Sequence, residues 1–431
     1  MAVEGKHKGR ERKGAVLSRQ EKERGRRAMR LLSLFLVVVV AFVAGFAVRS
    51  QTAFVQSLGF TVSPEEASAT ASSKNLKSTY DSISARVEEV EDLLSDNSLD
   101  ELDLEQATVS MLEAMLKATG DPYAAYFSPD RYSSYIKESS ERSYAGIGVL
   151  FSEYNGRAYV ADVFEGSEAA AKGVRQGDFV EAVDGDSSRQ WTLTEVVNSL
   201  ARDEGSSVII TWMRPISLDA EKGSEFTTTL VCQRYDVTNV TYELTGEVGY
   251  IRLRQITQNA SDLVKAAVTD LTNQGATSFV LDIRDNPGGY LTQAVDIASL
   301  FVKSGVLVEI RTVDGVSSKT ASGVTITDAP VVVLVNGYTS GAAEVLAAAL
   351  QDNQRAEVVG QTTLGKGSVQ VMRELTFGGA VRYTAAYYLS PLGHEINGVG
   401  VVPNIMVGTA DDADTQRLVA VDTAHSLVTR G

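Results

Sequence analysis

Apolar residues recur along this 431-residue chain with three different spacings, and each spacing predicts a different kind of element. A continuous uncharged apolar run covers residues 31–48. Between about residues 76 and 119, apolar side chains return every three or four positions, which predicts a pair of amphipathic helices. Gly120-Asp121-Pro122 should end the second helix. The residues that define the two helices are Ile83, Val87, Val90 and Leu94, then Leu104, Val109, Leu112, Met115 and Leu116.

Residues 143–235 change to short alternating segments separated by turns, which predicts a compact β-rich unit. Asn155-Gly156 should form the turn between its first two strands. The stretch AAAKG predicts a short helix ended by glycine, TLTEVVNSLARDEG predicts a second helix, and SSVIITWMR predicts a further strand.

From about Val240 onward, apolar strands alternate with helical stretches, the pattern of an α/β layered domain. In such domains the functional site lies where strands run into helices, so the turn after each strand is of interest. We expect strands in 248–256, 278–289, 330–340, 356–360 and 380–389, and helices in 261–275, 291–301 and 342–352.

The apolar run at 31–48 is just long enough to span a bilayer, and a basic arm precedes it. Residues 1–30 hold 11 lysines and arginines against four acidic residues, a net charge of +7. Because positive residues stay on the cytoplasmic side, the arm should lie inside and the chain after Arg49 outside the cell membrane. We predict an uncleaved single-pass anchor, followed by a linker. The alternative is a cleaved signal peptide with a weak small-residue site at Gly45–Ala47.

Beyond the arm the chain is acidic, because the whole molecule carries −15 and the remainder therefore carries −22. Such a body argues against nucleic-acid binding. A single cysteine, Cys232, excludes an intramolecular disulfide. The three histidines, His7, His394 and His425, fall in no pattern typical of a metal site or of a Ser-His-Asp triad. We expect no metal and no cofactor.

Candidate chemistry is concentrated between Ser340 and Gln370. Ser340 stands at the expected start of an alanine-rich helix, and Lys366 follows between two glycines. A serine hydroxyl and a lysine base can form a hydrolase without histidine or metal. If GKGSVQ is extended, Lys366 and Gln370 point to one face, and a lysine base should be buried with few acids near it. The structural alternatives are a helix cap for Ser340 and an exposed turn position for Lys366.

Residues 360–366 also fit GxxxxGK, the spacing of a phosphate-binding loop. Such a loop continues with serine or threonine at the start of a helix. Here Gly367 follows, and SVQVMRELTF alternates like a strand. Without a helix there is no N-terminal dipole for phosphate, so nucleotide binding is the least favoured interpretation.

Several stretches between Gly120 and Val407 together resemble the carboxy-terminal processing peptidases, also called tail-specific proteases. They are DPYAAYFSP (121–129), LDIRDNPGG (281–289), VLVNGYTSGAAE (333–344), ALQDNQRA (349–356), GQTTLGKGSVQ (360–370) and YYLSPLGHEINGVGVVPNI (387–405). The succession of turns and elements in 143–235 is similar to a PDZ domain of the kind found in proteases. Its peptide-binding loop would be Gly146-Ile147-Gly148-Val149.

The resemblance implies a Ser-Lys endopeptidase that recognises unfolded or C-terminal protein segments, with a PDZ domain that gates access. It implies that Lys366 is the general base, that Gln370 orients it, and that Gly288 and Gly289 lie at the oxyanion site. Independently of the resemblance, the amphipathic helical pair could serve a homodimer or simply cap the next domain.

The whole chain is then a multidomain α+β protein with a membrane anchor. Its expected parts are a basic cytoplasmic arm (1–30), a transmembrane helix (31–48), a linker (49–75), a helical region (76–142), a β-rich PDZ domain (143–235), an α/β layered serine-protease core (236–408) and a C-terminal segment (409–431).

One position departs from the resemblance. The family's serine stands three residues before the glutamate and 25 before the lysine, and both counts fall on Gly341. Two interpretations stay open: Ser340 takes over through a one-residue shift in the turn, or the chain is an inactive pseudoprotease that binds C-terminal peptides as a scaffold. Ser368 is a remote third hydroxyl, more typical of a strand face.

Overall fold

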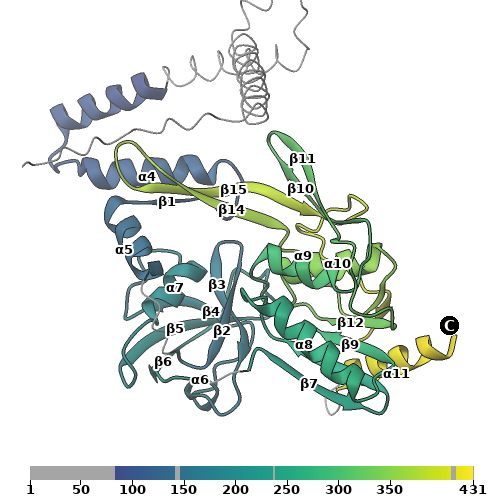
Figure 1. The fold of residues 1–431 in the computed structure, drawn as a ribbon. Helices are drawn as coiled ribbons and strands as arrows, with labels where there is room; N and C mark the ends of the chain where they lie inside the picture. The colour runs from purple at the N-terminus through teal and green to yellow at the C-terminus, as the bar shows by residue number, and fades with distance from the viewer. Residues whose placement is uncertain (1–82, 141–145, 236–237, 409–413, 431) are drawn as a thin grey trace, which may run out of the picture. The chain divides into compact units, whose positions relative to one another are not determined.

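A computed structural model describes residues 83–140, 146–235, 238–408 and 414–430 (Figure 1). The chain divides into two compact units, Met1–Asp103 and Leu104–Gly431. In the first, residues 83–97 are helical, as their apolar spacing predicted. The arm, the apolar run at 31–48 and the linker lie outside the described residues. Within those residues, no helix combines the length and apolarity needed to cross a bilayer.

The second unit begins with α4 (Leu104–Lys117), which ends just before the predicted stop at Gly120. Strand β1 (Ala125–Phe127) and helix α5 (Pro129–Ser140) follow. β1 pairs antiparallel with β15, more than 250 positions away in the chain. The expectation of a purely helical 76–142 region is therefore wrong at β1, because a three-residue strand is too short to show an alternating pattern.

Residues 146–235, which we name the β2–β6 unit, form a five-stranded sheet in the order β2-β3-β4-β5-β6. Asn155 and Gly156 both have positive φ and make the expected turn between β2 and β3. Helix α7 begins with a capping box between Thr192 and Glu195. The elements are β2 (Val149–Tyr154), β3 (Arg157–Val163), α6 (Glu168–Ala171), β4 (Phe179–Val183), α7 (Leu193–Ser199), β5 (Ser207–Pro215) and β6 (Gly223–Val231).

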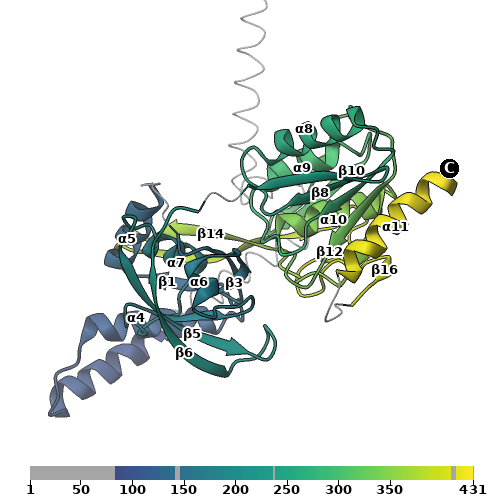
Figure 2. The same ribbon diagram turned by 90° about the horizontal axis from the view of Figure 1, so that it is seen from below.

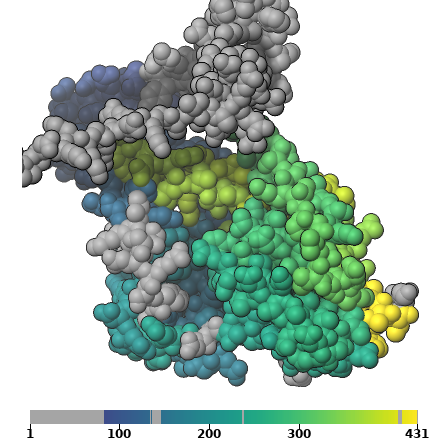
Figure 3. Space-filling view, in the orientation of Figure 1, coloured from purple at the N-terminus to yellow at the C-terminus, as the bar shows by residue number. Residues whose placement is uncertain are grey.

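Strands β2, β3 and β4 of this sheet are largely buried on both faces, whereas β6 is exposed along most of its length. On one face Val149 and Phe151 pack with Val196 of α7 in the unit's own apolar core. On the other face Tyr159 and Phe179 pack against residues of the segment that follows, including Tyr338 and Leu364. In the space-filling view the teal β2–β6 unit lies below the yellow-green strands β14 (Ser368–Glu374) and β15 (Ala380–Leu389), and the green residues lie beside both (Figure 3).

The six-stranded core sheet has the order β16-β13-β12-β9-β8-β7, parallel except for β7 at its edge. Helices α8, α9 and α10 cover one face, and α11 covers the other (Figure 2). This is the layered arrangement predicted from the alternating strands and helices. The elements are β7 (Val240–Thr245), β8 (Val248–Leu253), α8 (Ala260–Asn273), β9 (Ser278–Asp282), α9 (Leu291–Ser299), β12 (Val331–Val335), α10 (Ala342–Asp352), β13 (Ala356–Gly360), β16 (Ile405–Met406) and α11 (Thr415–Arg430).

A second sheet of the core has the order β1-β15-β10-β11, and β14 pairs with β15. Its other members are β10 (Val306–Thr312), β11 (Gly315–Thr320), β14 (Ser368–Glu374) and β15 (Ala380–Leu389). Because a strand follows GxxxxGK, the segment lacks the helix of a phosphate-binding loop. The whole is a multidomain α+β fold with antiparallel sheets and a mixed α/β core.

Candidate active site

Gly341 occupies the tight turn between β12 and α10. Its backbone has φ 60° and ψ −123°, the first central position of a type II′ turn, which residues with side chains rarely adopt. Gly341 also caps α10, and its N–H donates to Glu344 Oε2 at 2.9 Å. A Cβ atom built here would lie 3.7 Å from Pro287 O, an ordinary contact. The site therefore has room for a side chain, although the backbone disfavours one.

Ser340 points away from this turn. It is fully buried, and its Oγ lies 3.4 Å from Ser152 Oγ of strand β2. Its N–H donates to Asn286 O at 2.9 Å. The helix cap is Gly341, so the interpretation of Ser340 as a cap is wrong. The hydroxyl of Ser340 instead faces the β2–β6 unit.

Lys366 lies in the loop just before β14, between two glycines. Its side chain is 14% exposed, and Nζ lies 3.7 Å from Glu153 Oε2 of β2. Burial lowers the pKa of Lys366, while the nearby Glu153 carboxylate raises it. The lysine thus has the burial expected of a base, but an acidic neighbour that the sequence did not reveal.

Gln370 follows on β14, and its amide donates to Ser368 Oγ at 2.9 Å and to Thr384 Oγ1 at 3.4 Å. Ser368 and Lys366 both line a cavity of about 140 Å³. The structure therefore brings Gln370 to Ser368, and direct orientation of Lys366 by Gln370 stays a prediction. Tyr123 borders the same cavity, with its ring centroid 5.7 Å from Lys366 Nζ.

Glu344 joins the turn of Gly341 to the loop of Lys366. Its fully buried carboxylate accepts the N–H of Gly341 and of Lys366 on Oε2, at 2.9 and 2.8 Å. Oε1 accepts from Gly365 N and Thr363 Oγ1. Burial raises the pKa of Glu344 to about 7, against the opposing effect of these hydrogen bonds. The Glu344 carboxylate thus holds the turn of Gly341 and the loop of Lys366 together.

The turn at Gly288 and Gly289 packs directly beneath Ser340. A Cβ at Gly288 would come within 2.7 Å of Ser340 O, and one at Gly289 within 2.1 Å of Ile256 O, so both positions require glycine. The Gly288 N–H donates to Asn286 Oδ1 at 2.9 Å. The oxyanion donor expected from Gly288 is therefore engaged by a side chain in this structure.

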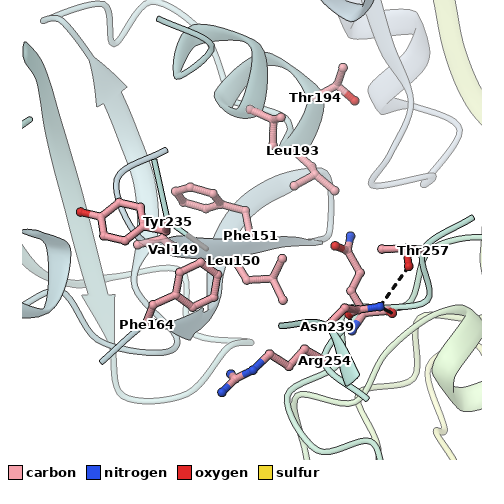
Figure 4. A pocket seen from close by; sticks show the side chains of 12 residues that line it. Val149, Leu150, Phe151, Phe164, Leu193, Thr194, Tyr235, Asn239, Arg254 and Thr257 are labelled. Carbon is pink, nitrogen blue, oxygen red and sulfur yellow. Dashed lines mark hydrogen bonds between the residues drawn. The ribbon is translucent and has the colours of Figure 1, made fainter. Parts of the chain in front are cut away.

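A cavity of about 530 Å³ runs along strand β2, between α7 and the residues that follow the β2–β6 unit (Figure 4). Of the four expected peptide-binding residues, Val149 lines it and Ile147 is buried in the unit's core. The carbonyls of Gly146, Ile147 and Gly148 accept hydrogen bonds from Gln233, Ala169 and Phe164. These bonds hold the loop against α6, the end of β3 and the segment after β6.

Besides Asn286 and the role of Glu344, sequence reasoning missed three contributors to the site. Ser152 and Glu153 come from β2, and Arg382 from β15 binds Glu153 Oε1 at 2.8 Å. No local pattern marks them, because they meet the site only when the β2–β6 unit packs on the core. For Asn286, the signal was its place inside the motif that ends at Gly289.

Comparison with known proteins adds to this geometry. The sequence model of peptidase family S41 matches residues 247–407. A carboxyl-terminal-processing protease of Picosynechococcus sp. is 37% identical over 302 residues, which cover 68% of this chain and 71% of that protein. Another, of Synechocystis sp., is 34% identical over 309 residues, covering 70% and 71%. The solved structure of a photosystem II D1 C-terminal processing protease matches with a TM-score of 0.60 and 30% identity, over 72% of this chain and 84% of that one.

Proposed function

This chain belongs to peptidase family S41, and we propose that its reaction is the one for which its relatives are named, serine-type cleavage of protein chains near their carboxyl termini. The observation that carries the proposal is the junction made by Glu344, which holds the lysine loop against the turn at Gly341. Protein substrates follow from this reaction.

In the proposed reaction, neutral Lys366 accepts the proton of a serine hydroxyl as Oγ attacks the peptide carbonyl carbon. Lysine then returns the proton to the leaving amine, and water hydrolyses the acyl-enzyme by the same steps. The backbone at Gly288 and Gly289 would stabilise the oxyanion once the Gly288 N–H leaves Asn286. Gln370 would support the lysine through Ser368, which it contacts.

Ser340 is the first candidate for the nucleophile, but it must turn away from Ser152 to reach Lys366. The second candidate function is a pseudoprotease that binds C-terminal tails as a scaffold. The observation that favours it is Gly341, which has space for a Cβ atom but carries no hydroxyl and has a backbone conformation that suits glycine.

Turnover of an unfolded protein separates the two functions. We would compare the natural chain with Ser340→Ala, Lys366→Ala and Gly341→Ser. Activity that Ser340→Ala abolishes would establish Ser340 as nucleophile. An inert natural chain and an active Gly341→Ser variant would establish the pseudoprotease. Activity that persists in both Ser340→Ala and Lys366→Ala would exclude the Ser-Lys mechanism.

The β2–β6 unit is proposed to be a PDZ domain in which a substrate tail adds as a strand to β2. β2 is the edge strand of its sheet, and the large cavity follows it. Peptides with a free terminal carboxylate should bind, and amidated ones should not. Equal binding of both would contradict this proposal.

A single-pass membrane anchor at 31–48, with the remaining chain outside the cytoplasm, is proposed from the apolar run and the basic arm. Protease protection of the arm, but not of the later chain, in sealed cells would test it.

A homodimer is proposed from the exposed apolar side chains of α4, which are Leu104, Met111 and Met115. Met111→Lys with Met115→Lys should yield monomers in sedimentation, whereas the polar-face control Ser110→Lys should not.

A further inference from the structure

The cavity along β2 has two walls of different chemistry. Phe151 and Leu193 lie on one side of β2, and Leu150 and Arg254 lie on the other (Figure 4). The first wall is apolar and comes from the β2–β6 unit. The second side combines Leu150 and Phe164 of the β2–β6 unit with a polar wall from the core, which consists of Arg254, Gln255, Asn239 and Thr257.

The polar wall is rigidly built. Asn239 Nδ2 donates to Gln255 O and to Thr257 Oγ1, both at 3.0 Å, and its Oδ1 accepts from Gln255 N. Arg254 donates from Nη1 to Asp162 Oδ2 at 2.7 Å, and its side chain is 31% exposed. A guanidinium group carries five N–H donors, so this bond leaves donors that a ligand can use.

A strand added to β2 would meet both walls, because successive side chains of a strand point to opposite faces. A tail that places its terminal apolar side chain against Phe151 and Leu193 would direct its penultimate side chain toward Arg254. In this enzyme the core therefore covers the side of the peptide that would otherwise face solvent.

We infer that Arg254 is a specificity-determining residue that selects tails with a hydrogen-bond acceptor, best a carboxylate, at the penultimate position and disfavours a basic residue there. The inference rests on the proposed function, because it assumes that a tail occupies this cavity. Arg254 offers charged donors to an acidic or amide side chain and repels lysine. The favoured occupant is thus a free C-terminal peptide with an apolar last residue and a glutamate before it.

Fluorescence anisotropy with labelled peptides tests this, on the full chain carrying Lys366→Ala to prevent turnover. The peptides end in valine and differ only in the penultimate residue: glutamate, glutamine, alanine or lysine. We expect the glutamate peptide to bind about five- to tenfold more tightly than the lysine peptide. Arg254→Met should remove this preference. Asp162→Ala, which removes the partner of Arg254, should increase the preference.

Arg157→Met is the matched control, because Arg157 is also an ion-paired arginine, bound to Glu181, but does not line the cavity. Equal affinities for the four peptides, or a preference that survives Arg254→Met, would overturn the inference. An amidated version of each peptide separates the two proposals. If amidation has no effect, tail binding itself is wrong; if amidation abolishes binding but the penultimate residue does not matter, only the role of Arg254 is wrong.

Discussion

Glu153 Oε2 lies 3.7 Å from Lys366 Nζ, so an acid of the edge strand β2 faces the lysine of the active-site loop. The other oxygen of Glu153 binds Arg382, which holds the carboxylate in place at 2.8 Å. Because a nearby carboxylate favours the charged form of lysine, the docked β2–β6 unit opposes the neutral lysine that catalysis needs.

Replacing Glu153 should therefore allow Lys366 to lose its proton, and act as a base, at lower pH. In a Gly341→Ser background, Glu153→Gln should lower the pKa of Lys366 and move the rise of kcat/KM with pH to lower pH values. A pH–rate profile on an unfolded protein measures this. Glu181→Gln, which removes the half-buried partner of Arg157, should leave the profile in place. A profile that stays fixed or moves to higher pH would contradict the role of Glu153.

Glu344 should make stability fall as pH rises. Burial raises its pKa from 4.5 to about 7, so between these values the unfolded chain releases the proton before the folded chain does. The folded state then loses up to about 3 kcal/mol relative to a non-titrating Glu344→Gln variant. Urea unfolding at pH 5 and pH 8 gives the difference between the two proteins. A difference that does not change with pH would show that Glu344 is not titrating in this range.

Replacing Arg284 should lower the free energy of unfolding more than replacing its exposed partner Asp414. Arg284 pairs with Asp282, which is fully buried, and with Asp414 at the start of α11, whose side chain is 45% exposed. Arg284→Met removes the nearer of two cations from this buried carboxylate, because Arg252 Nη1 lies 3.6 Å from Asp282 Oδ2. The loss should cost about 3 kcal/mol of unfolding free energy. Asp414→Ala removes an exposed ion pair and the bond from Arg417 N that caps α11, and should cost about 1–2 kcal/mol. Equal losses in denaturant unfolding would refute this ranking.

Asn286 should be needed for the shape of the oxyanion turn. Its buried amide accepts from Gly288 N at 2.9 Å and donates to Leu253 O at 3.0 Å. Asn286→Ala leaves both backbone groups without this partner and should lower stability by about 2 kcal/mol in thermal or urea unfolding. The control Asn97→Ala removes an exposed bond to Leu93 O and should change stability by less than about 0.5 kcal/mol. A similarly small loss of stability in Asn286→Ala would argue against a role of Asn286 in holding the turn.

The long apolar segments of the fold could be predicted closely from the sequence. Helix α10 and strands β13 and β15 have the residue ranges that their patterns indicated. Strand β11 could not be found in this way. All its residues are exposed, so no alternation between buried and exposed positions marks it.

Within the site, the sequence pointed to Lys366 and Gly341 because both belong to local motifs. It could not point to Glu153, which binds Arg382 from 229 positions away. That contact depends on how the β2–β6 unit packs on the core, and no periodicity along the chain records such packing. The role of Glu344 was also hidden, because its helix-cap spacing does not reveal the second contact with the lysine loop.

The conformation of Gly341 has a consequence for how activity and stability are balanced. A residue with a side chain at φ 60° and ψ −123° would store about 1–3 kcal/mol of backbone strain, which glycine avoids. The natural chain therefore rests in a relaxed turn. A serine at this position would introduce backbone strain into the turn. The gain of a hydroxyl near the lysine would therefore lower the thermal stability of the folded protein.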